Sequence, residues 1–288
     1  VNAINNGLNA NNISKFMGIL NRTSNFILTK MTREQTSFED ALDEAQRLGF
    51  AEADPTDDVE GVDAARKVVI TSYLSFNQVI KLNDVKLTGI SGTTLSDINA
   101  ADQLGFKIKL IGKGTYENGH VHASVEPTLI HKSHQLAAVE NEYNAIYVIG
   151  DAVGDTMFYG KGAGSLATGS AVVSDLLNVA LFFESNLHTL PPHFELKTDE
   201  TREMMDGEEP VVIQEKLNYY IVLQNNHLTV DKIENDIKAL LPFHKSLQIA
   251  ERDENTVAVI IIGLDQSPEY VLNKSGYEVE KIYPVEGV

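Results

Sequence analysis

The chain has 288 residues, of which 43% are hydrophobic and 22% charged, and it contains no cysteine. This composition is typical of a globular protein of one large or two ordinary domains, and it excludes disulfide bonds and thiolate chemistry. A net charge of −18 without a basic stripe argues against nucleic acid and anionic membranes as partners. No apolar run approaches the roughly twenty residues that span a bilayer. We therefore expect a cytoplasmic protein.

The first predicted elements are two short helices. Apolar spacing over residues 23–31 indicates a helix with Thr23 or Ser24 at its N-cap. A second helix begins after the cap residue Ser37 and ends at Gly49. Both helices have a local start signal, so their existence depends little on the rest of the fold.

The next stretch of the chain combines further helices with strands. Residues 63–76 predict a third helix, and a short strand follows near residues 85–91. Ser96 then caps a fourth helix that ends at Gly105. Alternating residues separated by the turn "ENG" predict a β-hairpin over residues 107–130.

The second half of the chain divides into two parts. Residues 144–160 predict two strands around a glycine turn, and residues 168–183 predict a long amphipathic helix. Residues 193–210 are polar, acidic and without period, which is typical of a linker. Residues 211–288 then read as βαββαβ, a ferredoxin-like order.

The stretch "EADPTDDVEGVDAARK" concentrates carboxylates at the entrance of the third helix. Asp63 and Lys67 are four residues apart, so they share one helical face. A solvated surface ion pair accounts for this spacing without any function. The alternative is that Lys67 is an acid/base group and that Glu52 and Asp58 complete a pocket for a cationic substrate group.

Two further stretches could contact a ligand. The segment "FYGKGAGSLATGSAVV" places Gly160, Gly162 and Gly164 before a helix, which would let a backbone approach an anionic ligand. Tight packing explains such glycines equally well. The segment "NRTSN" places Asn21, Arg22, Thr23 and Ser24 at a strand-to-helix turn, where capping accounts for the hydroxyl residues. The histidines show no metal-ligand spacing, so we expect no metal site.

Together these segments resemble the homoserine dehydrogenase family. "GILNRTSNFIL" is similar to that family's G-I-[VL]-N-G-T-[TS]-N-[YF]-I-L, and "LGFAEADPTDDVEGVDAARK" to L-G-[YF]-A-E-x-D-P-x-x-D-x-x-G-x-D-A-x-x-K. "GKGAGSLATGSAVVSDL" resembles G-x-G-A-G-x-x-P-T-A-S-A-V-x-x-D-L. The similarity runs from Val1 to about Phe183. Arg22 stands where the family usually has Gly, and Phe50 where it often has Tyr.

The resemblance implies an activity and roles for individual residues. The activity is reversible hydride transfer between L-homoserine and L-aspartate 4-semialdehyde with NADP or NAD, in threonine, methionine and isoleucine biosynthesis. Lys67 and Asp63 would be the catalytic residues. The substrate-binding residues would be Glu52, Asp58, Asp63 and Thr23. The cofactor-binding residues would be Gly49, Gly162 and Gly164.

The resemblance also implies an organisation of the chain. Residues 1–192 would form a mixed-sheet domain of class α/β (α+β) for substrate binding and dimerisation, and residues 211–288 an ACT-like regulatory domain. The family's N-terminal Rossmann domain would precede Val1, so this fragment alone would be inactive. We expect a homodimer or tetramer. The rival interpretation is a catalytically inactive module for oligomerisation or amino-acid sensing.

Overall fold

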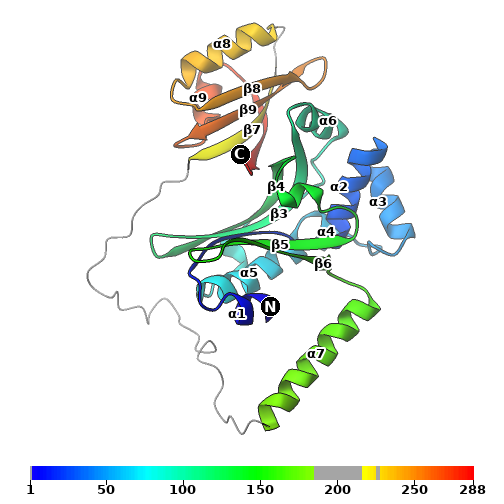
Figure 1. The fold of residues 1–288 in the computed structure, drawn as a ribbon. Helices are drawn as coiled ribbons and strands as arrows, with labels where there is room; N and C mark the ends of the chain where they lie inside the picture. The colour runs from blue at the N-terminus through cyan, green and yellow to red at the C-terminus, as the bar shows by residue number, and fades with distance from the viewer. Residues whose placement is uncertain (1, 185–215, 225–227) are drawn as a thin grey trace, which may run out of the picture.

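The computed structural model describes residues 2–184, 216–224 and 228–288 (Figure 1). The helices are α1 (Asn2–Gly7), α2 (Arg22–Glu34), α3 (Phe38–Arg47), α4 (Thr56–Val59), α5 (Val62–Phe76), α6 (Leu95–Gln103), α7 (Ser165–Glu184), α8 (Val230–Leu240) and α9 (Glu269–Lys274), with 3-10 turns η1 (Leu82–Asp84) and η2 (Gln135–Ala138). The strands are β1 (Ile13–Ile19), β2 (Lys86–Leu87), β3 (Phe106–Glu117), β4 (His120–His131), β5 (Tyr143–Gly150), β6 (Gly154–Lys161), β7 (Leu217–Gln224), β8 (Ser246–Glu251), β9 (Thr256–Leu264) and β10 (Val279–Glu286).

The described strands form one mixed sheet in the order β6-β5-β1-β3-β4-β10-β7-β9-β8, with β2 beside β4. Most neighbours are antiparallel, whereas β10 and β2 each pair with β4 in parallel. The β3–β4 hairpin closes through Asn118 and Gly119, which have φ angles of 52° and 85°. Positive φ at both central residues is what a tight hairpin turn requires. The expected mixed α/β fold and the expected hairpin are confirmed.

Helices α2, α5 and α6 cover one face of the first half of the sheet. Phe16 of β1, Ile27 of α2 and Val68 of α5 are fully buried in the cluster between these layers. Burial of each such side chain stabilises the fold by about 1.5–3 kcal/mol. This packing fixes the N-terminal ends of α2 and α5 relative to β1, and the candidate site lies at those ends.

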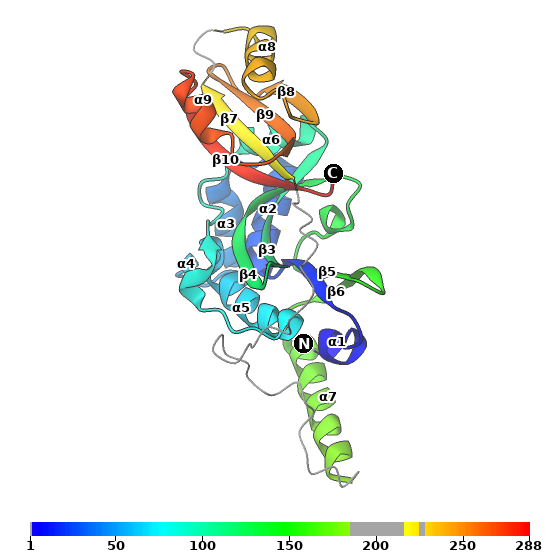
Figure 2. The same cartoon turned by 90° about the vertical axis from the view of Figure 1, so that its left-hand side faces the viewer.

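The C-terminal unit extends the same sheet (Figure 2). Its strands lie in the order β10-β7-β9-β8, which is the ferredoxin-like arrangement expected from the βαββαβ sequence. The helices α8 and α9 cover one face of this unit, and α6 of the preceding region contacts β8 and β9. Tyr220 and Tyr283 of the unit belong to the same buried cluster as Phe16. The two halves of the chain therefore share a core.

A group of charges around the buried Asp97 also joins the two halves. We define the junction cluster as Asp97 of α6 together with Arg252, Glu280 and Lys281, of which Glu280 is exposed. Asp97 is 0% exposed, and its two oxygens accept from Arg252 Nε at 2.8 Å and from Lys281 Nζ. Arg252 Nη1 also donates to Glu280 at 3.2 Å. Each buried charge has an opposite partner, as burial of ions demands.

Two helix caps differ from those expected. The cap of α2 is Asn21, whose Oδ1 accepts from the backbone N–H of Ser24 at 2.8 Å, so Thr23 and Ser24 lie inside the helix. The cap of α6 is Thr94 instead of Ser96, and Asp97 completes a capping box with it. In both cases several capping residues adjoin each other in sequence, and packing of the helix selects among them. The expected Ser37 cap of α3 is confirmed.

Helix α7 points away from the rest of the molecule (Figures 1 and 2). It begins at Ser165, three residues before the expected start, and its apolar side chains Leu166, Leu176 and Leu181 are exposed. The expected linker over residues 193–210 lies outside the described residues. So do the neighbouring domain boundaries at 192 and 211, and both boundaries stay predictions.

Candidate active site

Asn21 lies between two carboxylates at the turn from β1 to α2. Its side chain is 4% exposed, and Nδ2 donates to Asp58 Oδ1 at 2.7 Å and to Asp63 Oδ2 at 2.9 Å. Its Oδ1 is occupied by the helix cap, so every hydrogen-bonding group of the amide is used. Asn21 therefore holds two acidic side chains from α4 and α5 close together.

Lys67 joins this group from one turn further along α5. Its Nζ donates to Asp63 Oδ2 at 2.6 Å and to the backbone oxygen of Leu20 at 2.9 Å. We call Asn21, Asp58, Asp63 and Lys67 the helix-entrance cluster. Among the described residues, Asp58 Oδ2 and Asp63 Oδ1 have no hydrogen-bond partner, so each carboxylate keeps an oxygen for a ligand.

The helix-entrance cluster is open to solvent. The side chains of Lys67 and Asp63 are 45% and 32% exposed. A lysine side chain in this position can give a proton to a bound carbonyl oxygen as the ammonium, or take one from a bound hydroxyl as the neutral amine. The spacing of Asp63 and Lys67 correctly predicted their contact. Asp58, which the sequence placed in the same pocket, lies close to Asp63 through the bridging Asn21.

The other expected substrate-binding residues lie beside this cluster. Thr23 is buried, and its hydroxyl donates to the backbone oxygen of Phe50 at 2.6 Å. Glu52 lies two residues beyond, is exposed, and its carboxylate has no hydrogen bond or ion pair within the described part of the chain. Gln46 Nε2 holds the backbone oxygen of Glu52 at 2.9 Å. Thr23 thus fixes the loop that carries Glu52.

Arg22 meets the same loop. Its Nη2 donates to the backbone oxygens of Gly49 at 3.2 Å and Phe50 at 3.4 Å. Its guanidinium carbon lies 4.8 Å from the centre of the Phe50 ring. These contacts hold the guanidinium group on the Gly49–Phe50 loop.

The glycines expected at the cofactor come from two loops. Gly49, at the end of α3, has φ +72°, and a Cβ at that position would meet no atom within 4 Å. Gly164, in the turn from β6 to α7, has φ +117° and is equally open. A Cβ on Gly162 would instead lie 2.3 Å from Asn144, so packing explains that glycine directly. Gly49 and Gly164 expose backbone that a dinucleotide could approach.

Charges connect these two loops. Lys161, at the end of β6, pairs with Glu142 at 3.3 Å. The pKa of Glu142 is lowered chiefly by its own backbone N–H, and further by Lys161 and by the charge of Arg22. Arg22 and Lys161 therefore act on one carboxylate, which places the Gly49 loop and the glycine-rich loop on the same side of the molecule.

The sequence did not reveal the role of Asn21. Its partners Asp58 and Asp63 are 37 and 42 residues away, and no periodic pattern reports such a contact. The one local signal for Asn21 is its position directly before an expected helix, which predicts a helix cap but no contact with Asp58 or Asp63.

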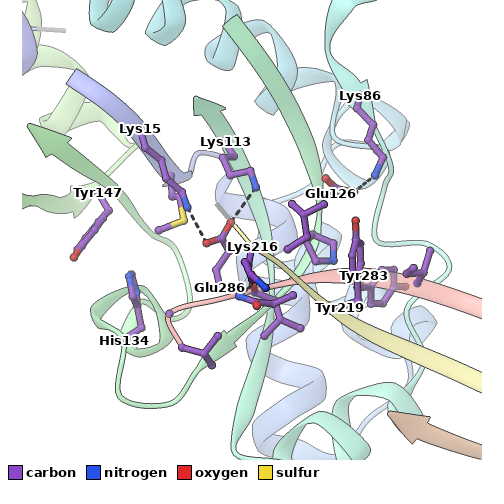
Figure 3. Close-up of a pocket in the computed structure, with 18 of the residues that line it drawn as sticks. Lys15, Lys86, Lys113, Glu126, His134, Tyr147, Lys216, Tyr219, Tyr283 and Glu286 are labelled. Carbon is purple, nitrogen blue, oxygen red and sulfur yellow. Dashed lines mark hydrogen bonds and ion pairs between the residues drawn. The ribbon is translucent and has the colours of Figure 1, made fainter. Parts of the chain in front are cut away.

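A pocket of about 470 Å³ lies elsewhere, lined by residues of β1, β3, β5, β7 and β10. Figure 3 shows Lys15 and Lys113 directed at Glu286, and Lys86 directed at Glu126. None of the expected site residues lines it.

Two features were not found among the described residues. These residues contain no group of three or more His, Asp or Glu side chains that could hold a metal ion. In the same part of the chain, no helix has the length and apolar character needed to cross a bilayer.

Comparison with known proteins places this geometry in a family. The family model described as homoserine dehydrogenase matches residues 1–177, and the model described as homoserine dehydrogenase C-terminal domain matches residues 216–288. The homoserine dehydrogenase of Bacillus subtilis is 54% identical over 173 residues, covering 60% of this chain and 40% of that protein. That of Pseudomonas aeruginosa is 43% identical over 199 residues, covering 69% of this chain and 46% of that protein.

Solved structures agree with these relatives. A crystal structure of S. aureus homoserine dehydrogenase has a TM-score of 0.84 and 73% identity, covering 97% of this chain and 67% of that chain. The enzyme of Thiobacillus denitrificans has a TM-score of 0.80 and 35% identity, covering 99% of this chain and 67% of that chain. A hyperthermophilic archaeal homoserine dehydrogenase mutant in complex with NADPH has a TM-score of 0.53 and 27% identity, covering 62% and 51% of the two chains. The chain thus spans less than half of its curated relatives, and it belongs to the homoserine dehydrogenase family.

Proposed function

We propose that this chain is the substrate-binding and C-terminal region of an enzyme that interconverts L-homoserine and L-aspartate 4-semialdehyde. The observation that carries the proposal is the contact of Lys67 with Asp63, held by Asn21 next to oxygens of Asp58 and Asp63 that have no partner among the described residues. A zwitterionic amino acid needs anionic groups for its ammonium and a proton-transferring group at its reacting oxygen. The family membership supplies the substrate class.

In the proposed reaction, each residue has a distinct task. Glu52, Asp58 and the available oxygen of Asp63 bind the substrate ammonium. In the oxidation direction, Lys67 Nζ as the neutral amine takes the proton of the substrate hydroxyl, and the carbon that bears this hydroxyl loses a hydride to the nicotinamide cofactor. In the reduction direction, the Lys67 ammonium returns a proton to the carbonyl oxygen. Asp63 and the backbone oxygen of Leu20 orient Nζ for this transfer.

The hydride acceptor is proposed to be NADP or NAD. When bound, the nicotinamide cofactor supplies hydride chemistry that side chains lack. The open backbone at Gly49 and Gly164 fits its approach, with Gly162 in the same loop. The chain spans less than half of its curated relatives, and the remaining cofactor contacts are proposed to lie outside it.

We further propose a cytoplasmic homodimer or tetramer. On the sheet face opposite α2 and α5, residues around η2 pack against only part of the sheet. Apolar side chains on and beside β6 remain exposed, including Tyr159 at 56% and Val153 at 51%. A second copy would cover this face. Size-exclusion chromatography with light scattering should give twice or four times the chain mass, and a monomer at micromolar concentration would contradict this assembly.

The enzymatic proposal is tested in the full-length protein that contains this chain. We expect NADP- or NAD-dependent oxidation of L-homoserine, and we expect Lys67→Met to lower kcat by about 10²–10⁴-fold, the usual contribution of a general acid/base group. Arg66→Ala, on the neighbouring helix position, is the matched control. Absence of turnover in the wild type would favour the rival interpretation of an inactive module.

A further inference from the structure

Arg22 is held rigidly by neutral groups at the first position of α2. Its Nη2 donates to two backbone oxygens, and its guanidinium stacks on Phe50, which packs edge-on against Phe26 at 4.9 Å between ring centres. Carbonyl oxygens and an aromatic face fix the position of a guanidinium group, yet neither cancels its unit charge.

Other cations near the helix entrance are paired with a carboxylate. Lys67 contacts Asp63 at 2.6 Å, and Arg66 contacts Asp57 at 2.5 Å. Among the described residues no carboxylate forms an ion pair with Arg22. The charge of Glu142 does act on Arg22, but Glu142 is already paired with Lys161 at 3.3 Å. Arg22 is thus a cation held by neutral groups, adjacent in sequence to Asn21 of the helix-entrance cluster, whose own cation Lys67 is paired with Asp63.

We propose that Arg22 binds the α-carboxylate of the amino-acid substrate, an inference that rests on the proposed function. A guanidinium group has five N–H donors, and the bonds to Gly49 and Phe50 use Nη2 alone, which leaves Nε and Nη1 for a carboxylate. The residue precedes Thr23 and follows Asn21, so its backbone adjoins the helix-entrance cluster directly. The protein carboxylates would then bind the substrate ammonium, Lys67 would contact the reacting oxygen, and Arg22 would bind the substrate α-carboxylate.

The same geometry suits any oxyanion, including a dinucleotide phosphate. The substrate carboxylate is favoured because Arg22 contacts the loop that carries Glu52, one of the proposed ammonium-binding residues. The experiment below distinguishes the substrate carboxylate from a dinucleotide phosphate.

The experiment compares two ligands that differ at the carboxylate. The full-length wild type, Arg22→Gly, Arg22→Lys and the control Arg47→Ala are titrated calorimetrically with L-homoserine and with L-homoserinol, in which a hydroxymethyl group replaces the carboxylate. We expect Arg22→Gly to weaken homoserine binding and raise its KM by about tenfold or more, as loss of a charged hydrogen bond does. Homoserinol binding, kcat and the KM for NADP should change by less than about twofold, which corresponds to about 0.4 kcal/mol, because none of them involves the substrate carboxylate. Arg22→Lys should retain part of the homoserine affinity.

Several results would overturn the assignment. Equal weakening for homoserine and homoserinol would show that Arg22 shapes the site without reading the carboxylate. A lower KM for homoserine in Arg22→Gly would show that Arg22 obstructs the site. A raised KM for NADP with unchanged homoserine binding would assign Arg22 to a phosphate.

The two proposals fail separately. If the wild type binds homoserine in an Arg22-dependent manner but does not oxidise it, the proposed reaction fails and the carboxylate assignment stands. If the wild type oxidises homoserine and Arg22→Gly matches it in every parameter, the assignment alone fails.

Discussion

The helix-entrance cluster and the junction cluster contain the same residue types in opposite environments. Both pair acidic side chains with lysine or arginine at hydrogen-bonding distance. In the first, the side chains of Asp63 and Lys67 are 32% and 45% exposed, whereas in the second those of Asp97 and Arg252 are 0% and 6% exposed. Both carboxylate oxygens of Asp97 accept hydrogen bonds, while Asp58 and Asp63 each keep one oxygen that has no partner among the described residues.

This difference indicates what each cluster does. Buried charges that are fully paired hold structural elements in one arrangement, because removal of one partner leaves an uncompensated ion. Exposed charges contribute little to stability but can meet a ligand. The junction cluster therefore fastens α6 to the C-terminal unit, and the helix-entrance cluster is available for chemistry. The following substitutions test that division.

The largest expected effect on stability is at Asp97. Asp97→Ala leaves Arg252 and Lys281 without their shared carboxylate and should lower the free energy of unfolding by about 3–5 kcal/mol. Urea denaturation followed by circular dichroism measures the loss, with Asp63→Ala as the matched carboxylate deletion in the exposed cluster. A loss of similar size for both variants would contradict the comparison.

The next effect is expected at Asn21, where the readout is activity. Asn21→Ser keeps a good cap for α2 but cannot bridge Asp58 and Asp63. We expect kcat/KM for homoserine to fall by about 10–100-fold, the scale of a small misplacement of catalytic groups. The unfolding free energy should change by less than about 1 kcal/mol. Unchanged kcat/KM would mean that the amide bridge does not position the site.

A third prediction concerns Lys109, a buried cation outside both clusters. Its Nζ donates to Asn25 Oδ1 at 3.1 Å and to the backbone oxygen of Val139 at 2.6 Å, and burial lowers its pKa from 10.5 to about 7. The charges of Lys107 and Arg33 lower this pKa further, and that of Glu140 opposes them.

The sign of the pH effect follows from that pKa. Between pH 7 and 10.5 the unfolded chain binds a proton that the folded chain does not. Lys109 therefore makes stability rise with pH, by about 1.4 kcal/mol per pH unit within this window. Lys109→Met should remove this slope. Unfolding free energies of wild type and variant at pH 7.5 and 8.5 provide the test, and a constant difference between them would contradict it.

The smallest effect is expected at Arg66, which is 54% exposed and pairs with Asp57 on the surface. Arg66→Ala should change the unfolding free energy by less than about 1 kcal/mol. Thermal unfolding is sufficient to check this, and a larger loss would show that surface pairs around α5 contribute more than their exposure indicates.

Much of the fold could be predicted because its signals are local. Helix α3 has its cap residue and its glycine stop within the sequence that forms it, and the β3–β4 hairpin has its turn. The contact of Asp63 with Lys67 follows from helical spacing alone. The family resemblance then predicted how these elements are combined, because three matching segments in the same order identify a family far more specifically than one motif does.

The remaining features depend on contacts between distant residues. Arg252 and Lys281 are 155 and 184 residues from Asp97, so neither spacing nor composition connects them. The caps at Asn21 and Thr94 were chosen by packing among adjacent polar residues. The sequence also does not show that both halves contribute strands to one sheet, because each half has a regular pattern of elements that reads as a separate domain.

The parallel pairing of β10 with β4 has a consequence for the order of folding. Val285 and Glu286 pair with Leu129 and Ile130, which are synthesised far earlier. Until β10 arrives, that part of β4 is an unpaired sheet edge, which is a template for association with other chains. Contacts of such long sequence separation form late. Strand β10 therefore covers this part of the edge of β4, and a chain without β10 would leave it exposed.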